Sequence, residues 1–284
     1  MPTISALDGI SLYYEEAGTG TPVVFVHEFA GDHRTWDPQM SYFARGHRCV
    51  TFSARGYLPS DVPTDPSLYS QRIACDDVIA LMDGLGIARA HVVGHSMGAY
   101  TALHAGINHP DRCLSVAAIG CGWGSSPQER DASVKLCEDI AAMFENEPIA
   151  VAAEKYANFA MRLSFKAKDP RGFARFTSMM AEHSGTGMAL TMLNLQLKRP
   201  TLWELETQLS AFSVPLLVIV GDEDAPCLDG SLFLKRTVPT AALLVIPRAG
   251  HTITSEEPAA VNAALAEFFA AVASNSWLAH KAQI

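Results

Sequence analysis

Short apolar runs alternate with helical patterns along most of this chain. Six apolar runs lie at residues 22–27, 48–53, 90–95, 113–120, 214–224 and 242–247. Helical patterns, the longest of them at residues 71–86, separate these runs. Continuous apolar strands that alternate with helices are typical of a parallel sheet covered by helices on both faces.

Two segments depart from this alternation. Residues 3–18 alternate roughly between apolar and polar side chains around a turn at Asp8-Gly9, which predicts a β-hairpin. Residues 124–209 are helical in pattern throughout, which predicts a cap over the sheet edge where α/β proteins place their sites. We therefore predict an α/β fold: a mostly parallel eight-stranded sheet flanked by helices, with a helical cap inserted after the sixth strand. The predicted segments are core residues 1–123, cap residues 124–209 and core residues 210–284.

The composition excludes several classes of protein. With 49% hydrophobic and 18% charged residues, the 284-residue chain is core-forming, and its net charge of -9 argues against a nucleic-acid or anionic-membrane surface. No signal-peptide pattern opens the sequence, and the apolar runs are too short to span a bilayer. The six cysteines lack metal-ligand spacing, so we expect reduced thiols, no metal and no cofactor. These features predict a cytoplasmic protein, a monomer or a homodimer, that binds neither nucleic acid nor membrane.

The strongest local motif is Gly94-His95-Ser96-Met97-Gly98, which ends one apolar run and opens a helical pattern. A G-x-S-x-G sequence between a strand and a helix is typical of a nucleophile elbow, in which the serine adopts a strained backbone conformation above the sheet. The helix N-terminus beneath it would stabilise developing negative charge. An ordinary tight turn is the alternative, and the placement favours the elbow.

A serine hydroxyl needs a base, and the base needs an acid to orient it. His251 is the best candidate for the base, because it lies on the loop between the last apolar run and the last helical pattern. Three acids follow an apolar run at Asp222, Glu223 and Asp224, whereas the loop at residues 121–124 has no carboxylate. The spacing alone leaves the choice among the three acids open.

With these motifs the chain resembles the α/β-hydrolase superfamily over nearly its whole length, and it is similar to enol-lactone and meta-cleavage-product hydrolases in cap placement and motif order. The order serine, acid, histidine is the one this fold uses. The turn Gly221-x-x-Asp224 resembles the acid-bearing turn of the superfamily, which implies Asp224 as the acid. The resemblance also implies an oxyanion hole formed by the backbone N–H groups of Phe29 and Met97.

Two positions depart from the superfamily pattern. Glu28 stands where a glycine is usual, and Ser53 replaces the acid of a turn that continues to Arg55. Because the two strands before these residues are neighbours in this fold, we predict a Glu28–Arg55 ion pair that braces the oxyanion loop. The alternative is that Glu28 enters the pocket as an acid–base group or as a clamp on a basic substrate.

The cap is expected to select a small-molecule substrate. It is rich in methionine, which suits an adaptable apolar pocket. The cap methionines are Met143, Met161, Met179, Met180, Met188 and Met192. Three arginines of the cap could hold a substrate carboxylate or simply be solvated: Arg162, Arg175 and Arg199.

These features together favour a serine hydrolase that cleaves a small, largely apolar ester or lactone through an acyl-enzyme. One alternative is a carbon–carbon or amide bond hydrolase of a small carboxylate-bearing compound. Thr252 counts against a meta-cleavage-product hydrolase, in which a tryptophan follows the base, and Ser96 excludes enzymes with a carboxylate nucleophile. An alternative of another class is a non-hydrolytic receptor for a small ligand on the same fold.

Overall fold

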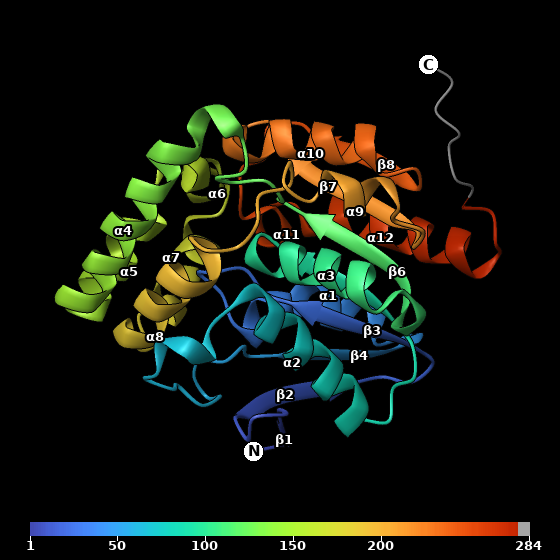
Figure 1. The fold of residues 1–284 in the computed structure, drawn as a ribbon, viewed down its shortest axis with the longest axis horizontal. Helices are drawn as coiled ribbons and strands as arrows, with labels where there is room; N and C mark the ends of the chain where they lie inside the picture. The colour runs from blue at the N-terminus through green and yellow to red at the C-terminus, as the bar shows by residue number, and fades with distance from the viewer. Residues whose placement is uncertain (278–284) are drawn as a thin grey trace.

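The computed structural model describes residues 1–277, and its centre is one eight-stranded sheet (Figure 1). The strand order is β1-β2-β4-β3-β5-β6-β7-β8. Strands β3 to β8 run parallel, while the β1–β2 hairpin joins β4 in the antiparallel sense. The strands are β1 (Thr3–Ser5), β2 (Ser11–Ala17), β3 (Thr21–Val26), β4 (His47–Phe52), β5 (Ala90–His95), β6 (Cys113–Ile119), β7 (Leu216–Gly221) and β8 (Ala241–Ile246). The predicted fold class is thereby confirmed.

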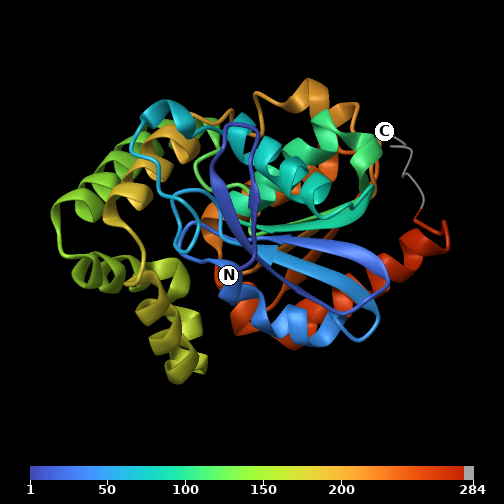
Figure 2. The ribbon, with the colours of Figure 1, turned by 90° about the horizontal axis from the view of Figure 1, so that it is seen from below.

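Helices cover both faces of the sheet (Figure 2). On one face lie α2 (Gln71–Gly84), α3 (Met97–Asn108) and α10 (Ala225–Thr237), and on the other lie α1 (Asp37–Phe43) and α12 (Pro258–Ala273). Every residue of β5 and β7 is buried, because their side chains pack against helices on both sides. Short helices complete the core: η1 (His33–Trp36), η2 (Pro66–Leu68), η3 (Pro110–Arg112), α9 (Glu206–Ser210) and α11 (Ile253–Glu256).

The cap is formed by consecutive helices between β6 and β7, at the left of Figure 1, toward which the arrowhead of β6 points. These helices are η4 (Pro127–Glu129), α4 (Arg130–Asn146), α5 (Ile149–Ala157), η5 (Ala160–Arg162), α6 (Leu163–Lys168), α7 (Pro170–Met180), α8 (Gly185–Leu190) and the π-helical η6 (Thr191–Gln196). The predicted cap after the sixth strand is thus present. The exact segment limits stay predictions, and Leu202, Leu205 and Leu209 pack in the same cluster as the sheet.

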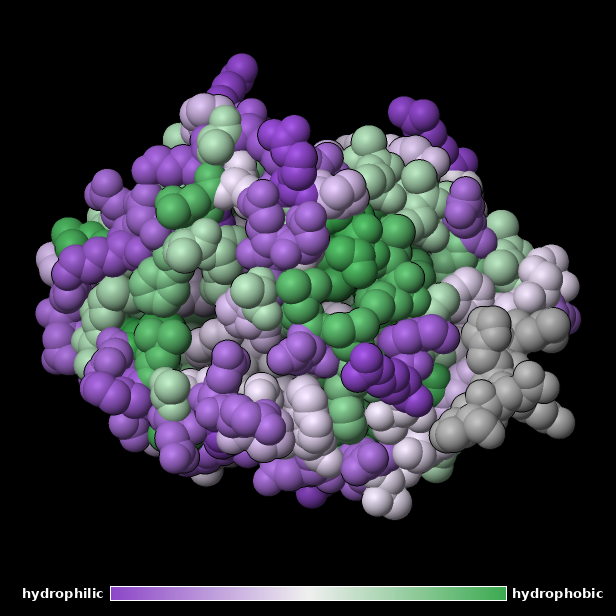
Figure 3. Space-filling view, turned by 90° about the horizontal axis from the view of Figure 1, so that it is seen from above, coloured by the Kyte–Doolittle hydropathy of each residue, from purple (hydrophilic) through white to green (hydrophobic). Residues whose placement is uncertain are grey.

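Figure 3 shows an apolar area on the core side, while polar and apolar side chains are mixed over the cap. Among the exposed large apolar residues are Leu232 of α10 and Val245 of the edge strand β8. Within residues 1–277, no helix combines the length and the apolar character needed to cross a bilayer.

Candidate active site

Ser96 lies in a tight turn between β5 and α3, and its φ of 53° and ψ of -109° are unusual for a residue with a side chain. Two glycines make this turn possible. A Cβ atom at Gly94 would lie 2.0 Å from the carbonyl oxygen of Gly98, and one at Gly98 would lie 2.1 Å from that of Val26. Any larger residue at either position would push α3 away from the strands.

Ser96, His251 and Asp224 form one hydrogen-bonded chain. The Nε2 atom of His251 is 2.9 Å from Ser96 Oγ, and its Nδ1 atom is 2.8 Å from Asp224 Oδ2. His251 and Asp224 are buried, whereas Ser96 is partly exposed. If Nδ1–H donates to the carboxylate, Nε2 is left free to accept the serine proton. The three residues singled out in the sequence therefore meet in space.

The neighbouring acid Asp222 has a different partner. Its Oδ1 atom accepts a hydrogen bond from the Ala249 N–H at 3.2 Å, in the loop that leads to His251. Asp224, at the start of α10, is the acid of this turn that hydrogen-bonds the imidazole. Asp222 instead ties the β7–α10 turn to the histidine loop.

Two backbone donors follow β3 and β5, which are neighbouring strands. Phe29 follows β3, and Met97 is the first residue of α3. Among residues 1–277, neither N–H donates to a backbone or side-chain acceptor. Both residues belong to the apolar cluster beneath the cap. The pair implied by the resemblance is thus free to bind a negatively charged oxygen.

The predicted Glu28–Arg55 pair is wrong, although β3 and β4 are neighbours as expected. Arg55 turns toward α2 and the N-terminal hairpin. Its Nη2 and Nε atoms lie 2.6 and 2.7 Å from the two Asp77 oxygens, and its Nη1 atom is 2.7 Å from Asp8 Oδ2. Glu28 turns toward the cap instead. Adjacent strands brought the two residues near each other, but their side chains leave the sheet in different directions.

The partner of Glu28 is Arg162 of the cap, and both side chains are buried. The Nη2 atom of Arg162 is 2.5 Å from Glu28 Oε2, and its Nη1 atom is 3.2 Å from Oε1. Burial alone would raise the pKa of Glu28, but the charge and hydrogen bonds of Arg162, together with the nearby His95 and His251, outweigh it and lower that pKa to about 2. The sequence signal for this pair was weak, because the two residues are 134 positions apart.

The other two cap arginines also have partners. Arg199 is buried against the Tyr100 ring, 3.7 Å from its centroid, and donates to the Trp123 carbonyl at 3.0 Å. Arg175 is exposed and pairs with Asp37 at 2.6 Å. Of the three cap arginines, Arg175 is solvated as one alternative expected, whereas Arg162 and Arg199 are buried.

Two groups of potential metal ligands include His251. One adds Glu28 and His95, and the other adds Asp224 and Cys227, with the ligand atoms of each group within 4.8 Å of one another. Neither group suits a cation. The first already faces the Arg162 guanidinium, and burial raises the pKa of the Cys227 thiol so that it stays protonated.

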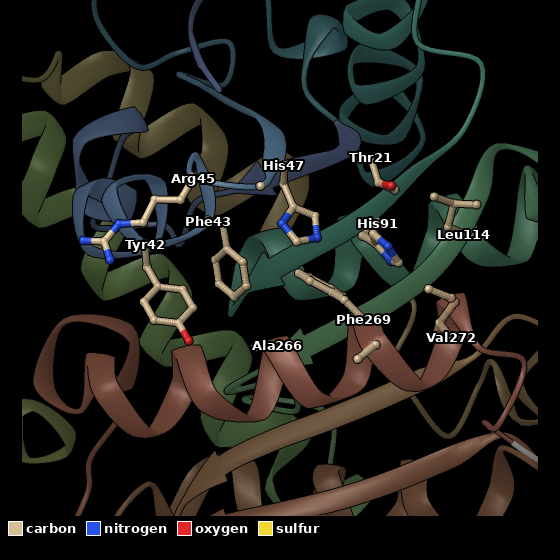
Figure 4. Close-up of a pocket in the computed structure, with 13 residues that line it drawn as sticks. Thr21, Tyr42, Phe43, Arg45, His47, His91, Leu114, Ala266, Phe269 and Val272 are labelled. Atoms are coloured by element: carbon tan, nitrogen blue, oxygen red, sulfur yellow. The ribbon is translucent and has the colours of Figure 1, made fainter. Parts of the chain in front are cut away.

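Next to Ser96, Met97 belongs to a buried apolar cluster that is built from side chains of core and cap. The cluster includes Tyr57, Phe144, Tyr156, Met180, Met188 and Met192, together with Phe29 and Met97. A separate depression of about 740 Å³ lies at the opposite end of the strands, between α12 and the α1–β4 connection (Figure 4). Its residues include Thr21, His47 and His91 but no member of the Ser96–His251–Asp224 chain. The apolar cluster beneath the cap, and not this depression, is therefore the side of the molecule that adjoins Ser96.

The fold and the geometry of this site are those of one protein family. Residues 21–258 match the family model described as alpha/beta hydrolase fold. The chain belongs to the α/β-hydrolase family. Its relatives in this family include proteins named as hydrolases, esterases and bromoperoxidases.

Individual relatives are similar over almost the whole chain. A protein of Caulobacter sp. (strain K31), provisionally named carbamate hydrolase RutD, is 28% identical over 90% of this chain and 95% of its own length. A thermophilic esterase from Thermogutta terrifontis has a TM-score of 0.84 and 27% identity, covering 95% of this chain and 98% of the esterase. The enol-lactonase from Burkholderia xenovorans LB400 has the same TM-score at 22% identity, covering 95% and 100% of the two chains, which is a likeness of fold.

Proposed function

We propose that the protein is a serine hydrolase that cleaves a small, largely apolar ester or lactone through an acyl-enzyme. The observation that carries this proposal is the chain of short contacts from Ser96 Oγ through His251 to Asp224, at 2.9 and 2.8 Å. Such a chain activates a hydroxyl that is otherwise a poor nucleophile.

The reaction proceeds in two halves. Ser96 Oγ attacks the carbonyl carbon while its proton passes to His251 Nε2, and the carbonyl oxygen takes up negative charge beside the N–H groups of Phe29 and Met97. The imidazolium returns the proton to the leaving alcohol oxygen as the carbon–oxygen bond breaks. Water then attacks the acyl-serine with the same histidine as base, releasing the acid and restoring Ser96. With a lactone, the alcohol stays attached to the acyl chain.

The apolar cluster beneath the cap supports a neutral, apolar substrate. Aromatic and methionine side chains make up most of this cluster, which adjoins Ser96 through Met97. The buried cation nearest the candidate site, Arg162, is already neutralised by Glu28. A substrate carboxylate would therefore compete with a protein carboxylate for this arginine, which weakens the carbon–carbon hydrolase alternative. The 27% identical esterase from Thermogutta terrifontis supports ester chemistry.

Hydrolysis of an amide or carbamate bond is the second candidate, because the 28% identical relative from Caulobacter is named for carbamate hydrolysis. The same residues would serve, with His251 protonating a leaving nitrogen instead of an oxygen.

The test is a panel of p-nitrophenyl esters of increasing acyl length, simple lactones, and matched amides and carbamates, assayed with the wild type and with Ser96→Ala. A fluorophosphonate probe should label the wild type rapidly, at one equivalent per chain and at Ser96. Turnover of esters or lactones above amides supports the main proposal, and the reverse ranking supports the second candidate. Slow labelling with no turnover of any substrate would mean that the site is not hydrolytic.

A further inference from the structure

The cap contacts both catalytic loops through one buried arginine. Arg162 lies at the end of η5 and is completely buried. It pairs with Glu28, the residue before Phe29 on the oxyanion loop. Its Nη1 atom also donates to Thr252 Oγ1 at 2.6 Å, one residue beyond His251. One side chain of the cap thus joins the loop of the base to the loop of the oxyanion donor.

The backbone reinforces this connection. The His251 N–H donates to the carbonyl oxygen of Met161 at 2.8 Å, so two consecutive cap residues hold two consecutive residues of the histidine loop. The His251 carbonyl is held from below by His95 Nε2 at 2.7 Å. His251 is therefore fixed between the nucleophile strand and the cap.

The charges around His251 are few. The titratable or charged groups that face it are Asp224 and Cys227 at α10, His95 at the end of β5, Glu28 after β3 and Arg162 of the cap. A carboxylate oxygen of Glu28 lies within 4.8 Å of a ring nitrogen of both histidines. Burial lowers the pKa of His95 to about 4, so His95 is neutral at pH 7, and the Cys227 thiol is protonated. Asp224, Glu28 and Arg162 carry the remaining charges.

We propose that Glu28 and Arg162 are positioning residues for this site. The pair holds the cap against the two catalytic loops. Arg162 also cancels the Glu28 charge, so that Asp224 is the charged group that governs the protonation of His251. The proposal rests on the hydrolytic function proposed above. It also explains why a glutamate can precede an oxyanion donor. Arg162 neutralises the negative charge of Glu28, so this charge does not repel the oxyanion.

Charge cancellation predicts opposite effects of the two single substitutions. In Glu28→Gln, the unopposed guanidinium disfavours the imidazolium, so the acid limb of kcat/KM should move to lower pH by about 1 unit. In Arg162→Met, the unopposed carboxylate favours protonation, and the limb should move to higher pH by a similar amount. In the double variant the limb should return to the wild-type midpoint, while kcat falls about tenfold because the cap has lost its contact with the histidine loop.

A control exists in a second ion pair between core and cap, which is exposed where the Glu28–Arg162 pair is buried. The Nη1 atom of Arg34 lies 2.7 Å from Glu182 Oε2. Glu182→Gln removes this pair and should leave the acid limb where it is. Arg162→Lys keeps the charge and should shift the limb less than Arg162→Met does.

The same titration can be followed without turnover, by NMR of the His251 imidazole in each folded variant. Opposite shifts by NMR in a protein that hydrolyses nothing would uphold this inference and reject the proposed function. Shifts in the same direction, or no shift in either single variant, would overturn the inference whatever the activity. If a single variant does not fold, the double variant decides, because a midpoint displaced by a full unit there would contradict charge cancellation.

Discussion

Ser96, the proposed nucleophile, has a strained backbone conformation. Its positive φ is maintained because its N–H bonds the Ile119 carbonyl at 2.8 Å and because glycines flank the turn. Ser96→Ala keeps the Cβ atom and removes only the Oγ atom, so the fold should persist. We expect kcat to fall by roughly 10⁴–10⁶-fold, measured on the best ester of the panel with the melting temperature as control. A folded variant that retains a tenth of the wild-type kcat would assign the nucleophile elsewhere.

The two aspartates of the β7–α10 turn provide a matched pair of substitutions. Asp224→Asn should lower kcat by roughly 10⁴-fold, because an amide favours the wrong imidazole tautomer. Asp222→Asn should leave kcat within about threefold, since Asp222 bonds the Ala249 N–H and not the ring. Steady-state kinetics on both variants checks this, and the reverse ranking would move the acid by two residues.

Local motifs predicted where the candidate site lies but not how its charged residues pair. The elbow, the acid turn and the histidine loop are each recognisable within a few consecutive residues. The partner of Glu28 lies on a cap helix 134 residues away, and the partners of Arg55 lie on α2 and the first hairpin. Such pairs depend on the direction of each side chain after its strand ends, which no local pattern encodes.

At the scale of elements, the strands were predictable because burial on both faces leaves a continuous apolar run. The run at residues 113–120 became β6 (Cys113–Ile119), for example. The cap was predictable as helical but not as separate helices. Two of its breaks carry local signals, because α7 and α8 begin after Asp169 and Ser184, whose side chains cap them. The π-helical turn at Thr191–Gln196 has no side-chain cap and depends on packing.

The junction of β5 and α3 can be tested through its glycines. Gly98→Ala places a Cβ atom 2.1 Å from the Val26 carbonyl oxygen, so α3 must shift away from β3. We expect a loss of about 2–3 kcal/mol in the free energy of unfolding, measured by urea titration. Gly46→Ala is the control, because a Cβ atom there meets no atom within 4 Å. Equal stability of the two variants would show that the elbow does not depend on this close approach.

For the whole molecule, buried histidines make stability depend on pH. His27, His91 and His95 are almost fully buried, and burial lowers their pKa values to about 4, 3 and 4. Their pKa in the unfolded chain is about 6.5. Between these values the unfolded chain binds protons that the folded chain does not. This contribution to stability is complete above about pH 6.5 and is lost as the pH falls toward 4.

The free energy of unfolding should therefore fall between pH 7 and pH 5, by up to ~1.4 kcal/mol per pH unit for each of these histidines. The lowered pKa of Glu28, about 2, adds its effect only below this window. His91 allows a clean test, because it lies at the opposite end of the strands from Ser96 and stacks on Phe269. The His91→Gln variant loses that stacking, so its free energy of unfolding should drop at every pH. The pH dependence of this free energy should become shallower by the contribution of one histidine. Urea titrations at fixed ionic strength measure both slopes, and parallel slopes for variant and wild type would show that His91 is not buried in its neutral form.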